Sequence, residues 1–160
     1  MTPELIENAE ETLASLQAAG LMVATVESCT GGLIAAALTE VPGSSASVER
    51  GFVTYSNAAK TELVDVPATL IEAHGAVSPE VAAAMAAGGL ARSSADIAVA
   101  VTGIAGPGGS EFKPEGLVCF HAVRRGGTSI ADRIEFGAIG RANVREKTVL
   151  RAFELIAEVI

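Results

Sequence analysis

A short apolar run in the middle of the chain, Ile97-Ala98-Val99-Ala100-Val101, constrains the fold more than any other segment. It is rich in small and β-branched residues and has no polar alternation, which is typical of a strand that is buried on both faces. A sheet that contains such a strand needs helices on both sides, so the run predicts a three-layer α/β domain. The run ends in a glycine-rich turn, residues 102–109.

The rest of the chain supplies the other elements. We expect further strands at residues 21–26, 50–55, 116–123 and 128–136. Helices are predicted at residues 4–19, 30–39, 58–64, 68–73, 79–92 and 142–159. Arg124–Gly127 is typical of a hairpin turn, which makes the last two strands antiparallel. The sequence therefore predicts a single domain over residues 1–160, a three-layer α/β/α sandwich around a mixed, mostly parallel five-stranded sheet.

Composition excludes several classes of function. The net charge of −8 argues against nonspecific nucleic-acid binding, which needs a cationic surface. No apolar run reaches the roughly 20 residues of a membrane span, and no signal-peptide pattern follows Met1. Cys29 and Cys119 are too few for a disulfide framework, so we expect reduced thiols in a cytoplasmic protein. His74 and His121 lie far apart and form no metal-ligand pair, so neither a metal nor a cofactor is expected.

The segment Val23–Gly32 has the pattern of a buried strand, a small polar turn and the start of a helix. Ser28 lies where a hydroxyl can act as a nucleophile, and Gly31 and Gly32 let a ligand approach the backbone. We expect the free N–H groups of this helix to hold an anion or a developing oxyanion. The alternative is structural, with Ser28 or Thr30 serving only as the helix cap.

Three predicted strands end in polar or glycine-rich turns, at residues 27–32, 55–60 and 102–109. If these strands are parallel, the turns meet in one crevice at the carboxyl edge of the sheet, where α/β proteins bind ligands. No P-loop, dinucleotide fingerprint or G-x-S-x-G motif is present. The residues of these turns that we expect to contact a ligand are Thr30, Gly31, Gly32, Asn57, Gly103 and Gly106.

A serine nucleophile without a histidine partner needs another base, and Lys60 is the candidate. It lies one turn into the predicted helix at residues 58–64, close in sequence to Tyr55 and to Asn57, the expected cap. A lysine can act as a base only where burial lowers its pKa by several units. The alternative is an ordinary solvated lysine.

Two arginines lie one turn apart at the start of the last predicted helix. Arg141 and Arg145 either clamp a phosphate or a carboxylate, or form a solvated helix face with Glu146 nearby.

Four ordered blocks of the sequence resemble those of the CinA C-terminal domain family, which is named after competence- and damage-inducible proteins. The resemblance covers nearly the whole chain, and the chain is similar to the stand-alone form of the domain. It implies a three-layer sandwich with a mixed five-stranded sheet. The blocks are Glu27-Ser28-Cys29-Thr30-Gly31-Gly32, Tyr55-Ser56-Asn57-Ala58-Ala59-Lys60, His74-Gly75-Ala76-Val77-Ser78 and Thr102-Gly103-Ile104-Ala105-Gly106-Pro107-Gly108-Gly109.

Characterised members of this family are nicotinamide mononucleotide deamidases of pyridine nucleotide salvage, which release nicotinic acid mononucleotide and ammonia. The resemblance implies Ser28 as nucleophile, Lys60 as its base, Tyr55 and Thr102 as supporting catalytic residues, and Arg145 as an anion contact. It implies a small-molecule nucleotide substrate, with no nucleic-acid or membrane partner. A homodimer is expected from the commonness of such assemblies.

Two departures from the family pattern stand out. Members often have Gly-Asp-Arg where this chain has Ile139-Gly140-Arg141, which leaves the role of Arg141 open. Members often have Lys-Pro-Val-Gly where this chain has Lys113-Pro114-Glu115-Gly116. Two other functions also remain open: a noncatalytic nucleotide-binding module, and an amidase of a different small amide.

Overall fold

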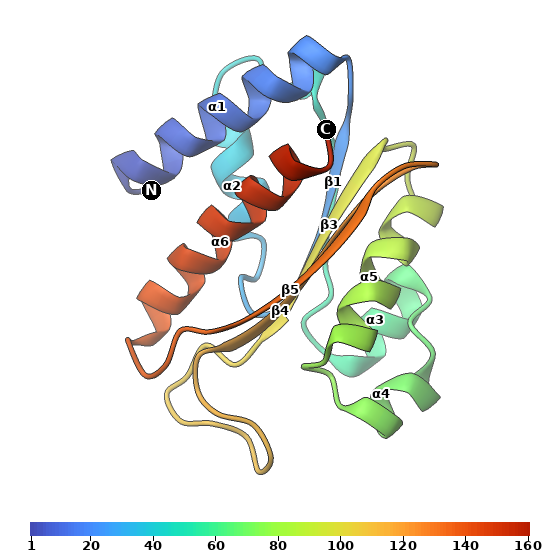
Figure 1. Ribbon diagram of the computed structural model, residues 1–160, viewed down its shortest axis with the longest axis vertical. Coiled ribbons are helices and arrows are strands. Elements are labelled where there is room, and N and C mark those ends of the chain that lie inside the picture. Colours follow the sequence, from blue (N-terminus) through green and yellow to red (C-terminus); the bar gives the residue numbers. More distant parts are fainter.

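The computed structural model describes residues 1–160 and contains one five-stranded sheet between two layers of helices (Figure 1). The strand order is β2-β1-β3-β4-β5. The strands are β1 (Val23–Glu27), β2 (Val48–Val53), β3 (Ile97–Gly103), β4 (Leu117–Arg124) and β5 (Ser129–Glu135). The helices are α1 (Pro3–Ala19), α2 (Leu33–Glu40), α3 (Asn57–Val64), α4 (Ala68–His74), α5 (Pro79–Ala91) and α6 (Arg141–Glu158), with a short 3₁₀ helix at Ser44–Ala46.

The sheet confirms the α/β class and corrects one detail of it. Strand β1 pairs in parallel with β2 and with β3, whereas the β3–β4 and β4–β5 pairs are antiparallel. The prediction of a mostly parallel sheet was therefore wrong. The physical reason lies in the connection between β3 and β4, residues 104–116, which contains no helix. A parallel pair needs a crossover, usually through a helix, so this loop can only return the chain antiparallel.

Helices cover the sheet unequally on its two faces (Figure 1). Helices α1, α2 and α6 enclose a cluster of 23 buried apolar residues, and α3, α4 and α5 cover a separate cluster of 8. Strand β3 lies at the centre and contributes Val99 to the larger cluster and Ala100 to the smaller one. The central apolar run is thus buried from both sides, as its sequence predicts.

Helix α5 continues through two adjacent glycines, Gly88 and Gly89. A Cβ atom at Gly88 would lie 1.8 Å from the carbonyl oxygen of Val64, and one at Gly89 would lie 2.5 Å from Cγ2 of Val26. The absence of both side chains lets α5 approach the end of α3 and the sheet closely. These glycines therefore serve packing and do not end the helix.

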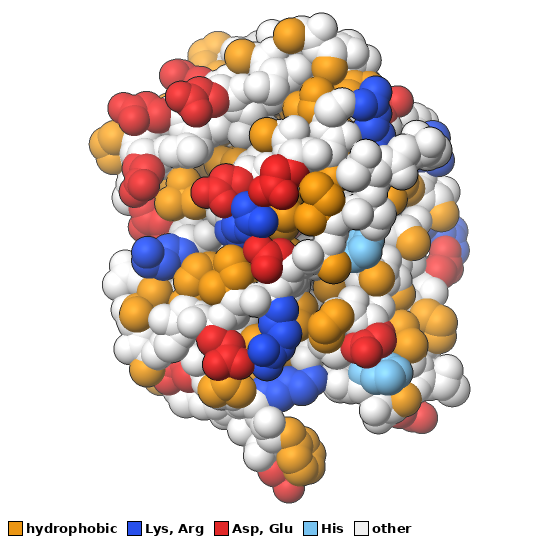
Figure 2. Space-filling view, in the orientation of Figure 1, with side chains coloured by type: hydrophobic (Ala, Val, Ile, Leu, Met, Phe, Trp, Pro, Cys, Tyr) orange, Lys and Arg blue, Asp and Glu red, His pale blue; other side chains and the backbone are white.

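The surface is uneven in charge and in shape (Figure 2). Acidic side chains gather over α1, whose glutamates are not balanced by any basic residue. The loop between β3 and β4 projects from the body of the molecule in Figure 1, and Phe112 on this loop is 84% exposed. No helix combines the length and the apolar character that crossing a membrane requires.

Candidate active site

The three parallel strands end at the same edge of the sheet, and a cavity of about 240 Å³ lies there. Of the residues expected at the site, it is lined by Ser28, Tyr55, Asn57, Lys60, Thr102 and Gly103. The other lining residues are Cys29, Ala76, Val77, Ala105 and Arg141. Thr30, Gly31, Gly32, Gly106 and Arg145 were also expected to contact a ligand, but they do not line this cavity.

Ser28 and Lys60 form a buried pair in this cavity. The distance from Lys60 Nζ to Ser28 Oγ is 3.0 Å, and Nζ also donates to the carbonyl oxygen of Thr54 at 2.8 Å. The exposed fractions are 8% for Ser28 and 1% for Lys60. Helix α3 supplies the lysine and is capped by Ser56, whose Oγ accepts from the N–H of Ala59, so the expected cap at Asn57 was one residue too late.

Burial sets the electrostatics of this pair. Lys60 takes part in none of the ion pairs of the protein, so its amine has no carboxylate to stabilise the charged form. Loss of solvent lowers the pKa of Lys60, an effect that Cys29 opposes only in part. The same burial raises the pKa of the Cys29 thiol to about 12, which leaves that thiol a poor nucleophile at neutral pH.

A buried carboxylate occupies the start of α2. Glu27 is fully buried, and it accepts hydrogen bonds from the N–H groups of Gly32 at 3.1 Å, Ile34 at 3.0 Å and Ala35 at 2.9 Å. The hydroxyl of Thr25 donates to it at 3.1 Å. The expectation that these N–H groups hold a substrate anion was therefore wrong, because the protein's own carboxylate already fills the position.

Glu27 also replaces the cap that the sequence suggested. The N-cap residue of α2 is Gly32, which makes no side-chain cap bond, so neither Ser28 nor Thr30 has this role. Sequence reasoning missed Glu27 although a signal was present, an acidic residue between a buried strand and a helix. Since the carboxylate satisfies the helix terminus, the hydroxyl of Ser28 remains free for chemistry.

The two arginines of α6 have different partners. Arg141 donates to the carbonyl oxygen of Gly106 at 2.9 Å and to the hydroxyl of Tyr55 at 3.0 Å. Arg145 donates to the carbonyl oxygen of Thr30 at 2.7 Å and ties α6 to the turn after β1. Arg141 is thus the guanidinium that lines the cavity, and the two do not form a joint clamp.

The helix that carries both arginines begins without a side-chain cap. Gly140 is the N-cap residue of α6 and has φ 93° and ψ 141°. Only glycine adopts this conformation readily, so the backbone at the start of α6 suits the glycine that this chain has here.

Thr102 lies in the last part of β3, because the strand extends past its predicted end at Val101 to Gly103. Its hydroxyl donates to the carbonyl oxygen of Ala76 at 2.8 Å. Ala76 and Val77 escaped the sequence prediction because they follow a helix and not a strand. Their sequence signals were the family block His74–Ser78, which assigned them no role, and the adjoining helix start at Ser78, which does cap α5.

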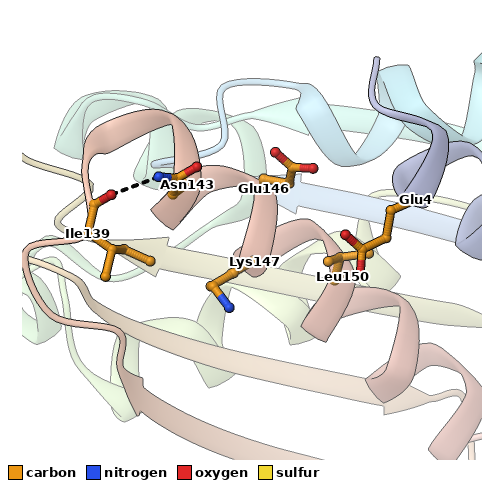
Figure 3. Close-up of a pocket in the computed structure, with 6 residues that line it drawn as sticks. All are labelled: Glu4, Ile139, Asn143, Glu146, Lys147 and Leu150. Carbon is orange, nitrogen blue, oxygen red and sulfur yellow. Dashed lines mark hydrogen bonds between the residues drawn. The ribbon is translucent and has the colours of Figure 1, made fainter.

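Other hollows lack comparable chemistry. One of about 330 Å³ lies between α6 and the first residues of α1 (Figure 3). Its polar groups include Glu4, Asn143, Glu146 and Lys147, and Asn143 donates to the carbonyl oxygen of Ile139 at 2.8 Å. It contains no nucleophile beside a base. No group of three or more histidine, cysteine, aspartate or glutamate side chains is arranged to hold a metal ion.

Comparison with known proteins confirms the family suggested by the sequence blocks. Residues 6–160 match the family model of the CinA C-terminal domain. A CinA-like protein of Mycolicibacterium vanbaalenii is 55% identical over 139 residues, which are 86% of this chain and 33% of that protein. The chain thus spans about a third of the length of the curated relatives it matches first.

Solved structures agree with this result. The competence/damage inducible protein CihA from Agrobacterium tumefaciens has a TM-score of 0.95 at 48% identity, over 99% of this chain and 96% of that chain. A CinA superfamily protein from Klebsiella pneumoniae has a TM-score of 0.91 at 35% identity, over 96% of each chain. The chain therefore belongs to the CinA C-terminal domain family.

Proposed function

We propose that this protein is an amidohydrolase that deamidates nicotinamide mononucleotide to nicotinic acid mononucleotide and ammonia. The observation that carries the proposal is the contact of 3.0 Å between Ser28 Oγ and the amine of Lys60. This amine is buried and forms no ion pair with a carboxylate. A serine hydroxyl next to an amine with a lowered pKa is the arrangement that nucleophilic catalysis by a Ser–Lys pair requires. Membership of the CinA family supports the choice of substrate.

The proposed reaction begins with Lys60 neutral. Its amine takes the proton of Ser28 as Oγ attacks the carboxamide carbon, and the bond to Thr54 keeps the amine in place. The resulting ammonium group gives this proton to the leaving nitrogen, so ammonia departs and an acyl-serine remains. Water, deprotonated by Lys60, then hydrolyses the ester and releases the carboxylate product.

The oxyanion of the tetrahedral intermediate needs donors on the side of Ser28. The N–H of Gly31 is used by the Ser28 carbonyl, at 3.0 Å, and that of Gly32 by Glu27. The N–H of Thr30 has no acceptor within the protein, and that of Cys29 has none beyond its own thiol. We assign the first oxyanion contact to Cys29, the residue after the nucleophile, and one such donor is typically worth about 2.7–4 kcal/mol.

The size and charge of the cavity support a nucleotide that extends beyond it. A volume of about 240 Å³ is below the range of roughly 300–1,000 Å³ that is typical of ligand pockets. The amide-bearing ring fits beside Ser28, while the ribose phosphate must reach the rim. Arg141 is the guanidinium on that rim, so we assign the phosphate to it instead of Arg145.

Ammonia release from nicotinamide mononucleotide tests the proposal, with Ser28→Ala as the control. Turnover that is lost in the variant supports it. Binding of the nucleotide without turnover would instead favour a noncatalytic module. Turnover only of nonnucleotide amides, such as free nicotinamide, would favour a different amidase.

A further inference from the structure

The segment His74–Ser78, which we call the strap, joins α4 to α5 and passes beside the nucleophile. Ala76 and Val77 of the strap line the cavity that contains Ser28. The same two residues line a second hollow of about 470 Å³, whose wall includes the projecting loop between β3 and β4. The strap therefore lies between two hollows, although Ala76 also packs against the smaller apolar cluster.

Side chains hold the first four carbonyl groups of the strap. Lys113 Nζ donates to the carbonyl oxygens of His74, at 2.9 Å, and of Val77. Ser78 Oγ donates to the carbonyl oxygen of Gly75 at 2.9 Å, and Thr102 Oγ1 to that of Ala76 at 2.8 Å. Three of these four bonds come from outside the strap, two from the projecting loop and one from β3. The direction of the strap backbone is thus set by Lys113 and Thr102.

Two N–H groups of the strap, in contrast, are unused. Neither the N–H of Ala76 nor that of Val77 has an acceptor in the protein. Ala76 and Val77 are half-buried at the cavity, so these free main-chain donors are available to a ligand or to water. Oxyanion sites are commonly built from two such donors, one from the residue after the nucleophile and one from a separate loop. Cys29 provides the first here. The free N–H of Thr30 belongs to the same turn, but Thr30 does not line the cavity, whereas Ala76 and Val77 do.

We propose that the strap provides this second oxyanion donor, from Ala76 or Val77, and that Lys113 and Thr102 are positioning residues that hold it in place. The inference rests on the proposed serine mechanism and adds a part to it. Lys113 lies on the projecting loop, 39 residues from His74 in sequence, and its two bonds join this loop to the strap. With hollow space behind the strap, loss of these bonds lets the N–H groups move away from the oxyanion.

Lys113→Met tests whether the two bonds from Lys113 position the strap, with Lys147→Met as the matched control. Lys147 is the remaining lysine outside the Ser28–Lys60 pair; it lies exposed on α6, and its side chain makes no hydrogen bond. Removing a complete oxyanion donor typically lowers kcat about 100- to 1,000-fold. A loosened donor should cost less, and we expect Lys113→Met to lower kcat about tenfold or more with KM within about twofold. Thr102→Val, which preserves the shape of the side chain, should act in the same direction.

A second readout separates positioning from simple loss of structure. A fluorophosphonate reacts with an active serine by forming a bond from Oγ to phosphorus, expelling fluoride and passing the serine proton to the base. Its phosphoryl oxygen occupies the oxyanion position. Lys113→Met and Thr102→Val should therefore be labelled more slowly than the wild type at a pH high enough for the labelling rate to reach its plateau. The pH of half-maximal labelling should not change, because the low pKa of Lys60 arises from burial.

The outcomes distinguish this inference from the proposed function. If the wild-type protein labels at Ser28 but releases no ammonia from nicotinamide mononucleotide, the substrate assignment fails and the labelling rates still decide the strap. The inference would be overturned if Lys113→Met and Thr102→Val had the same kcat and the same labelling rate as the control Lys147→Met. A shift of the labelling pH in both variants would also overturn it. A wild-type protein that neither labels nor turns over would overturn both proposals.

Discussion

Replacing Glu27 with glutamine should destabilise the protein strongly, although the change is isosteric. Each oxygen of the carboxylate accepts two hydrogen bonds: Oε2 from the N–H groups of Gly32 and Ile34, and Oε1 from Ala35 and the Thr25 hydroxyl. An amide has only one acceptor oxygen. Its NH₂ group must therefore face one of these two pairs of donors.

The least costly orientation places the NH₂ group of the substituted side chain toward Thr25, whose hydroxyl can turn to accept from it. The N–H of Ala35 then stays buried and unpaired, at a cost of about 1–3 kcal/mol. Loss of the negative charge at the start of α2 adds about 0.3–1 kcal/mol, or up to about 2 in a buried setting. The sum is about 1.3–5 kcal/mol, a substantial part of the roughly 5–15 kcal/mol of a typical domain.

Denaturant titration of Glu27→Gln and of the control Glu62→Gln measures this cost. Glu62 is exposed on α3 and its side chain makes no hydrogen bond, so the control should stay within about 0.5 kcal/mol of the wild type. In thermal unfolding, Glu27→Gln should lose roughly 3–20 °C in Tm, at about 2–4 °C per kcal/mol for a chain of this size. A midpoint equal to that of the control would refute the assignment of Glu27 as the cap of α2.

Three further predictions concern Lys60 and Gly88. Because burial lowers the pKa of Lys60, the unfolded chain binds more protons between the folded pKa and about 10.4, and the free energy of unfolding rises with pH there. The free energy of unfolding should rise by up to about 1.36 kcal/mol per pH unit in the wild type, and Lys60→Met should abolish this slope. Denaturant titrations from pH 6 to about 10 measure it, and an unchanged slope in the variant would contradict the lowered pKa. Lys60→Arg keeps a charge but cannot act as a base, so its rate of ammonia release should be as low as that of Lys60→Ala. Adding Ser28→Ala to either variant should lower the rate little further. An active Lys60→Arg would exclude the lysine as base. Gly88→Ala should destabilise the protein by more than the roughly 1 kcal/mol that alanine gains in helix propensity, because its Cβ would meet the Val64 carbonyl at 1.8 Å; a rise in Tm would show that α5 moves away freely.

The sequence is informative where structure follows local patterns. The unbroken apolar run of β3 predicted a strand buried on both faces, and Ser78-Pro79 predicted the start of α5. Three strand ends with polar turns predicted a shared crevice, since parallel strands end at the same edge. These inferences need only periodicity, capping chemistry and sheet geometry.

The remaining features depend on contacts that periodicity does not encode. The β3–β4 pairing follows from the absence of a helix in the connecting loop, which the turn residues alone did not reveal. Lys113 reaches the strap across 36 and 39 positions of sequence, so no local pattern links them. The reason for Gly88 and Gly89 in α5 is likewise hidden from the local sequence, because the carbonyl of Val64 and the side chain of Val26 come from other elements.

The two helix layers differ in the number of buried apolar residues that hold them to the sheet, and this difference affects how the site comes apart on heating. Only 8 buried apolar residues anchor the layer of α3, α4 and α5, against 23 on the opposite face. Regions with few such contacts open locally at a lower free energy than the whole domain. Lys60 and the strap belong to the thinly anchored layer, whereas Ser28 follows the central sheet. Mild heating should therefore separate Lys60 from Ser28 while the sheet is still intact, with amide protons of α3 exchanging before those of β3. The contact between the two side chains would then be lost well before the domain melts.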